Sequence, residues 1–170
     1  MEQVVSLISA VQFPDLAAVT SLTIGDKSYT AAAATAMAEL LLAKCPNVTH
    51  LSLADVIAGR MELEGLEILT TFSATCGASM PSLTHLDLSD NAMGLKGISA
   101  CSPLFSASRK TLSSLSMCND GLSHQSMCEV ADLLTEAPAI QVSPRSPPLV
   151  RTCVPCICVP CTCVPCTTLT

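Results

Sequence analysis

Residues 83–94 read Leu-Thr-His-Leu-Asp-Leu-Ser-Asp-Asn-Ala-Met-Gly, and this stretch decides the fold. Leucines occupy alternate positions in its centre, and Asn91 follows three residues after the last of them. The same pattern begins again at Val19, Val48 and Leu112. Measured at the position of Asp90, the four copies are 29, 35 and 29 residues apart. A chain that repeats one short motif at such intervals is expected to stack one structural unit per copy.

The Leu-x-Leu-x-x-Asn core is the sequence signature of leucine-rich repeats, and these intervals leave room for a full helix in each repeat. Parallel strands place like positions of successive repeats side by side, about 4.8 Å apart. Three columns should therefore form buried ladders: Val19/Val48/Leu83/Leu112, Leu22/Leu51/Leu86/Leu115 and Ile24/Leu53/Leu88/Met117. We predict an α/β leucine-rich repeat solenoid of about four strand-loop-helix repeats.

Period and turn residues set the expected bounds of these elements. The expected strands are 21–24, 48–53, 84–88 and 114–117, and the expected helices are 30–44, 62–76, 96–106 and 124–136. Gly77 should stop the second helix. Pro103 should kink the third helix or end it early. We assign residues 1–20, with a short helix at 3–12, to an N-terminal capping segment, 21–140 to the repeat domain and 141–170 to a disordered tail.

Charge and composition limit the classes of partner. The chain carries 14 acidic and 8 basic residues, a net charge of −6. All the acids precede Gln141, whereas Arg145 and Arg151 follow it, so the repeat region is more acidic than the whole chain. Such a surface repels nucleic acid and anionic membrane and favours a basic protein partner. With 49% hydrophobic but only 2% aromatic residues, the core must be mainly aliphatic.

Nothing in the sequence indicates secretion or membrane insertion. The N-terminal apolar run is short and has no positive start, unlike a secretory signal. No run reaches the roughly 20 apolar residues that span a bilayer. Five cysteines are scattered singly through the repeats, as small apolar fillers are in a reducing compartment: Cys45, Cys76, Cys101, Cys118 and Cys128. We predict a soluble cytosolic or nuclear-rim protein.

The tail ends in three Cys-Val-Pro-Cys units between Cys153 and Cys166. A metallothionein-like thiolate cluster is one interpretation. Zinc modules, however, separate their cysteine pairs by a dozen or more residues, whereas one residue separates these pairs. We therefore favour a low-complexity tail, and predict that residues 142–170 form no stable core and bind no stoichiometric metal.

One polar column stands out beyond the strands. Asp26, Asp55, Asp90 and Asn119 should line one rim of the sheet, as either a solvated turn stripe or a docking edge. His50 and His85 share a strand column with two serines and are expected to be surface residues rather than ligands. No set of nucleophile, base and orienting group is identifiable, and no phosphate-binding glycine loop occurs.

The loops at this rim carry a specific resemblance. The stretch Asp55-Val-Ile-Ala-Gly-Arg60 is followed by Leu88-Ser-Asp-Asn-Ala-Met-Gly94 and then Asn119-Asp-Gly121. In order and spacing these motifs, within about residues 21–136, resemble those of the Ran GTPase-activating proteins of plants and yeast. The resemblance implies a ribonuclease-inhibitor-type crescent that binds the nuclear-transport GTPase Ran in its GTP-bound form and speeds its GTP hydrolysis.

The resemblance also implies roles for particular residues. Arg60 corresponds to the family's loop arginine, and Asn119 to the asparagine that helps position the catalytic glutamine of Ran. Asp55, Asp90, Asn91 and Asp120, in the neighbouring contact loops, would bind the partner. The protein would be a GTPase activator rather than an enzyme with its own substrate, and it would need no metal and no other cofactor. Arg60 would act without entering the nucleotide site.

The chain departs from this family in two ways. The family's solenoid has several further repeats and an acidic end, whereas this chain has four repeats and a cysteine-rich tail. A truncated or inactive relative is therefore one expectation. The alternative is a non-catalytic leucine-rich repeat scaffold that uses the same concave face for another partner.

Overall fold

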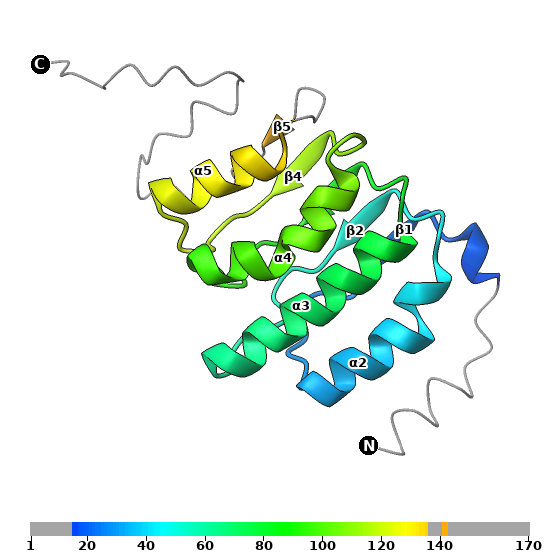
Figure 1. The fold of residues 1–170 in the computed structure, drawn as a ribbon. Coiled ribbons are helices and arrows are strands. Elements are labelled where there is room, and N and C mark those ends of the chain that lie inside the picture. The colour runs from blue at the N-terminus through cyan, green and yellow to red at the C-terminus, as the bar shows by residue number, and fades with distance from the viewer. Residues whose placement is uncertain (1–14, 136–140, 143–170) are drawn as a thin grey trace, which may run out of the picture.

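The computed structural model describes residues 15–135 and the backbone of residues 141–142. Within these residues, five short strands form one parallel sheet in chain order, and four α-helices lie side by side along one side of it (Figure 1). The strands are β1 (Ser21–Thr23), β2 (His50–Ser52), β3 (His85–Asp87), β4 (Ser114–Ser116) and β5 (Gln141–Val142). The helices are α2 (Ala31–Leu40), α3 (Glu62–Ser79), α4 (Gly94–Ser108) and α5 (His124–Leu133), with 3-10 turns η1 (Leu16–Ala18) and η2 (Leu42–Lys44).

The strand register confirms the predicted ladders. Leu22, Leu51, Leu86 and Leu115 are paired in turn across the four strands. Ladder residues of the central repeats are at most 3% exposed, whereas Val19, Leu22 and Met117 at the two ends are only partly buried. Each interior repeat is covered by neighbours on both sides, and the aliphatic ladders therefore build the core of a solenoid. The chain has the α/β leucine-rich repeat fold that its sequence predicts.

The predicted helix stop at Gly77 is wrong, and of the two outcomes predicted at Pro103 the early helix end is wrong. Gly77 does not stop α3, which continues to Ser79, and Pro103 does not end α4, which continues to Ser108. The two helices pack closely there, since a Cβ on Gly77 would lie 3.0 Å from the Pro103 carbonyl oxygen. The N–H of Leu104 donates to Ser73 Oγ of α3 at 3.1 Å. Gly77 is thus a close-contact residue, and α3 supplies a hydrogen bond beside the proline.

The first helix of the array is shorter than predicted. The Thr30 side chain accepts a hydrogen bond from the Ala33 N–H and begins α2, but the α-helix ends at Leu40 and η2 follows. The predicted helix at residues 3–12 lies outside the described residues. Within the described part of the chain, none of the helices has both the length and the apolar character needed to cross a membrane.

A fifth strand was not predicted. Gln141 and Val142, which the sequence pattern places in the tail, pair in parallel with Ser114 and Leu115 of β4. A repeat leaves an open sheet edge after its strand, and a further extended segment can pair with that edge. The backbone of these two residues therefore belongs to the sheet. The rest of the predicted tail, 143–170, and its cysteine pairs lie outside the described residues.

Candidate functional site

The rim at the carboxyl ends of the strands is built from one repeated turn. Asp26, Asp55, Asp90 and Asn119 each follow a strand and have left-handed φ angles of 57°, 55°, 63° and 57°. Aspartate and asparagine tolerate this conformation better than most side chains. Because the strands are parallel, the four turns lie along the same edge of the sheet. The sequence column is therefore a real structural row, and its shared geometry explains the shared residue types.

Two members of this row contact each other. Asn119 Nδ2 donates a hydrogen bond to Asp90 Oδ1 at 2.9 Å, and both residues are exposed. An amide next to a carboxylate also avoids the like-charge repulsion that a further aspartate would bring. The amide of Asn119 is therefore held at the rim with one face turned to a neighbour and the rest accessible to solvent.

A groove of about 600 Å³ opens beside this row. One wall is the loop and helix start at residues 57–62, and the other is the next loop at residues 90–96. Arg60 and Asp90 both line the groove, but Asp55 and Asn119 do not. Lys96 and Glu62 form an ion pair between its two walls. The structure thus brings Arg60 and Asp90 together at one groove, and Asp90 connects that groove to Asn119.

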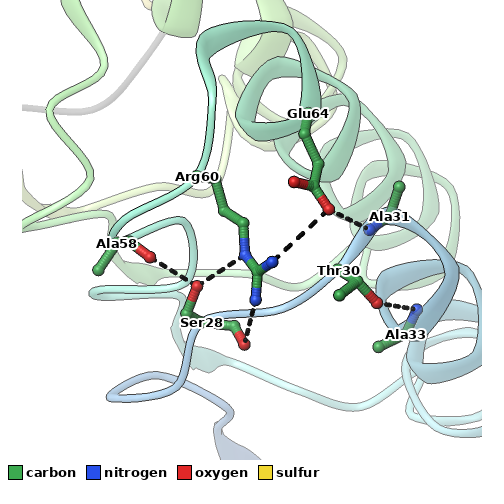
Figure 2. Close-up of polar contacts among 7 residues, drawn as sticks. All are labelled: Ser28, Thr30, Ala31, Ala33, Ala58, Arg60 and Glu64. Atoms are coloured by element: carbon green, nitrogen blue, oxygen red, sulfur yellow. Dashed lines mark hydrogen bonds and ion pairs between the residues drawn. The ribbon is translucent and has the colours of Figure 1, made fainter.

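Arg60 is held by contacts with the preceding repeat (Figure 2). Its Nε donates to Ser28 Oγ at 2.9 Å, and its Nη2 donates to the Ser28 carbonyl oxygen at 3.4 Å. Its Nη1 lies 3.8 Å from Glu64 Oε1, which accepts the Ala31 N–H at the start of α2. Ser28 Oγ in turn donates to the Ala58 carbonyl oxygen at 2.6 Å. The guanidinium therefore joins two adjacent loops and is not free to extend.

Ser28 and Glu64 were not predicted as part of the site. Glu64 lies four residues after Arg60, but Arg60 precedes α3, so the rule for side chains four residues apart on a helix does not identify this pair. Ser28 lies 32 residues away in another repeat, and no motif identifies it. Only the stacking of the repeats brings its hydroxyl to the arginine.

Asn91 is a structural residue and not an accessible contact, which corrects its predicted role. It is 1% exposed. Its Oδ1 accepts the Val56 N–H at 2.9 Å, and its Nδ2 donates to the carbonyl oxygens of Leu53 and Leu88 at 2.9 and 2.7 Å. A third carbonyl, of Ser89, lies at 3.2 Å. The side chain connects the backbones of two repeats beneath the rim and has no group left for a partner.

Asp120 is also buried, so its predicted contact with a partner is corrected in the same way. It is 2% exposed, its Oδ1 accepts the Asn91 N–H at 2.8 Å, and its carbonyl oxygen accepts the Gly94 N–H at 3.1 Å. Burial raises the pKa of its carboxyl group from 3.8 to about 7, assisted by the nearby charges of Asp90 and Asp87. Asp120 therefore fixes the loop before α4 from below and leaves Asn119 as the exposed residue of the turn.

The strand face opposite the helices carries two stacked histidines. The rings of His50 and His85 lie 4.0 Å apart and nearly parallel, at 13°, and each Nδ1 lies within 3 Å of a threonine hydroxyl. Both rings line a shallow hollow of about 200 Å³ together with Asp87 and strand serines. Both histidines are exposed, as the sequence predicts. In the described part of the chain, no group of three or more His, Cys, Asp or Glu side chains is placed to hold a metal ion.

These features define the class of protein. Parallel strands with alternating buried leucines, a repeated left-handed turn and a helix per repeat define a leucine-rich repeat solenoid. The family model described as "Leucine Rich repeat" matches residues 79–100, which contain β3 and its turn.

Two curated proteins of Arabidopsis thaliana are similar to the chain. It is 38% identical over 98 residues to RAN GTPase-activating protein 2, which covers 58% of this chain and 17% of the relative. It is 36% identical over 88 residues to RAN GTPase-activating protein 1, covering 52% of this chain and 16% of the relative. The chain thus spans about a sixth of the length of these relatives. The chain is similar to Ran GTPase-activating proteins over about half of its length, which confirms the resemblance predicted from the loop motifs.

Proposed function

We propose that this chain stimulates GTP hydrolysis on a Ran-type small GTPase in its GTP-bound form and thereby serves nucleocytoplasmic transport, in the cytoplasm or at the nuclear envelope. One observation carries the proposal: this chain, which is similar over 98 residues to a Ran GTPase-activating protein, has a rim on which Asn119 and Asp90 are exposed and hydrogen-bonded at 2.9 Å. The core does not require this arrangement, since both side chains point to solvent.

The proposed chemistry is positioning rather than direct attack. GTP hydrolysis needs a water-orienting side chain held still, and a second protein can supply that constraint. The exposed amide of Asn119 can donate to or accept from a glutamine side chain of the GTPase. The acidic neighbours Asp26, Asp55 and Asp90 favour docking of a basic surface.

Arg60 has a supporting place in this proposal. Its contacts with Ser28 and Glu64 hold its partly exposed guanidinium against the loop of the preceding repeat. An arginine that entered the nucleotide site would have to break all of these contacts. We therefore infer that Arg60 joins the first two rim loops and lines the groove next to Asp90, and that the GTPase meets a preformed surface.

Single-turnover GTP hydrolysis on Ran tests the proposal. Saturating full-length chain should raise the rate above the intrinsic value, and Asn119→Ala should remove about 100-fold of that acceleration or more. Arg60→Ala should also reduce it, because the loop beside the groove loses its brace. Asn47→Ala and Arg109→Ala are matched controls, since these exposed residues precede β2 and β4 at the opposite edge of the sheet.

The outcomes separate the two candidate functions. No acceleration by the wild type at saturation contradicts the catalytic proposal. If GTP-bound Ran still binds in that case, and binding requires Asp90, the chain is the non-catalytic scaffold considered as the alternative. Equal losses in the rim variants and in the opposite-edge controls would indicate general damage to the fold and would also count against a rim site.

A further inference from the structure

The side chain of Asp120 occupies, in the fourth repeat, the position of Asn91 in the third. The register of β3 and β4 pairs Leu86 with Leu115, so each residue of one repeat has a counterpart 29 residues on. The Oδ1 atoms of the two side chains each accept a backbone N–H from the preceding repeat. Asn91 Oδ1 accepts the Val56 N–H of the preceding repeat at 2.9 Å, and Asp120 Oδ1 accepts the Asn91 N–H at 2.8 Å.

The second polar atom of each side chain differs between the two repeats. Asn91 Nδ2 donates to the carbonyl oxygens of Leu53 and Leu88. In the register of β3 and β4, the residues that correspond to Leu53 and Leu88 are Leu88 and Met117, so we expect their carbonyls to be the acceptors nearest Asp120. Asp120 has an oxygen there, and among the described residues this Oδ2 is the buried side-chain atom with no hydrogen-bond partner. A carboxylate cannot donate to a carbonyl, whereas a carboxylic acid can.

We propose that Asp120 is a neutral carboxylic acid in the native protein at mildly acidic pH, and that its Oδ2–H then donates to a carbonyl group at the end of the strands, as the amide of Asn91 does in its own repeat. In this form Asp120 is a positioning residue, because it holds the turn that presents Asn119. That second role rests on the function proposed above. Loss of the proton leaves a buried negative charge facing carbonyl oxygens, and the turn should then loosen.

The surroundings of Asp120 favour the proton. The ionisable groups that face it are Asp87 and Asp90, from β3 and the turn after it, and the thiol of Cys101 from α4. None of these groups is a cation. Burial has the largest effect, and together with the two aspartates it outweighs the stabilising N–H groups of residues 91–92, so the pKa rises to about 7. The proton is therefore exchanged near neutral pH.

The difference in the pKa of Asp120 between the folded and unfolded chain makes the stability of the protein fall as the pH rises. The unfolded chain releases the Asp120 proton near its ordinary pKa of 3.8, and the folded chain releases it near 7. Between these values the folded state holds one proton more, so the equilibrium constant for unfolding rises with pH by up to tenfold per unit. Above about pH 7 both states are ionised at this residue and the effect levels off.

Asp120→Asn tests the proposal, because an amide can make the same donor bond at every pH. Unfolding of the full-length wild type and of Asp120→Asn should be measured in urea, under reducing conditions, from pH 5 to pH 8.5. The advantage of Asp120→Asn should grow from pH 5 to pH 7 and then become constant. Other titrating groups are common to both proteins, so the difference between the two curves reports on Asp120.

Two further measurements keep the proposal open to contradiction. Carbon-13 NMR of the Asp120 carboxyl in the wild type should give a midpoint near pH 7, and a midpoint below about pH 5 would overturn the proposal. Asp120→Ala, which cannot donate, should be less stable than Asp120→Asn at every pH. A pH-independent difference between wild type and Asp120→Asn would also overturn it.

The positioning role has its own readout. If the chain activates Ran, wild-type activation relative to Asp120→Asn should fall as pH rises from 6 to 8. A constant ratio would overturn the positioning role while the stability measurements still decide the proton. If neither protein activates Ran, the proposed function fails, and the unfolding and NMR measurements remain valid without it.

Discussion

Removal of the Asn91 side chain is the sharpest test of the hydrogen bonds that join the repeats beneath the rim. Asn91→Ala would leave the Val56 N–H and the carbonyls of Leu53 and Leu88 buried without their partner. Each such group costs about 1–3 kcal/mol when it is left unpaired. Even at the low end the three groups together amount to about 3 kcal/mol, a large part of the roughly 5–15 kcal/mol that stabilises a typical domain.

The assay is urea unfolding of the full-length chain, followed by far-UV circular dichroism at pH 6 under reducing conditions. We expect the free energy of unfolding to fall by about 3–5 kcal/mol in Asn91→Ala. The control is Asn119→Ala, which removes the same side chain at an exposed position of the next repeat and should cost about 1 kcal/mol, mainly because alanine tolerates the left-handed backbone there less well than asparagine. A loss below about 1 kcal/mol in Asn91→Ala, or equal losses in both variants, would refute the structural role assigned to Asn91.

Two further predictions concern the packing of the helices. Gly77→Ala should destabilise the chain by about 1–3 kcal/mol, because its Cβ would meet the Pro103 backbone. Gly65→Ala in the same helix, where the nearest atom is the end of a flexible side chain, should cost less in the same unfolding assay, and the reverse order would contradict this account. Burial raises the pKa values of Cys76 and Cys101 to about 12, so both thiols should resist iodoacetamide at pH 8 until urea is added. Peptide mapping by mass spectrometry checks this, and modification of either thiol at the rate of exposed ones would contradict it.

The ladders were predictable because they depend on local spacing alone. Alternate leucines face one side of a strand, and a fixed repeat places them on neighbouring strands, so the pairing of Leu51 with Leu86 follows from counting. The helix ends were less predictable. Gly77 has the usual signature of a stop, but its contact with Pro103 arises between repeats, and single-helix rules do not contain that contact.

The candidate site likewise contains some features that the sequence predicts and others that arise only when the repeats stack. The left-handed turns at Asp90 and Asn119 were predictable in position, because the residue types and their column agree. The brace on Arg60 was not, since the Ser28 hydroxyl comes from another repeat. The burial of Asn91 and Asp120 had a signal in the sequence: both occupy the asparagine position of the Leu-x-Leu-x-x-Asn core. The motif marks a structural position, and the resemblance led us to predict a contact there.

An exposed residue followed by a buried one in each turn explains how the rim can be accessible to a partner and still have fixed side-chain positions. In each of the last two turns one residue faces solvent, Asp90 or Asn119, and the next residue inserts beneath the sheet edge. The buried neighbour bonds to backbone groups of the adjoining repeat, so the exposed side chain is fixed without contacts of its own to the core. A protein that acts by holding another protein's catalytic side chain still needs this combination, because a mobile rim would lose the advantage of positioning. Substitution of the buried residue should therefore impair the exposed one, whereas substitution of the exposed residue should leave the fold intact.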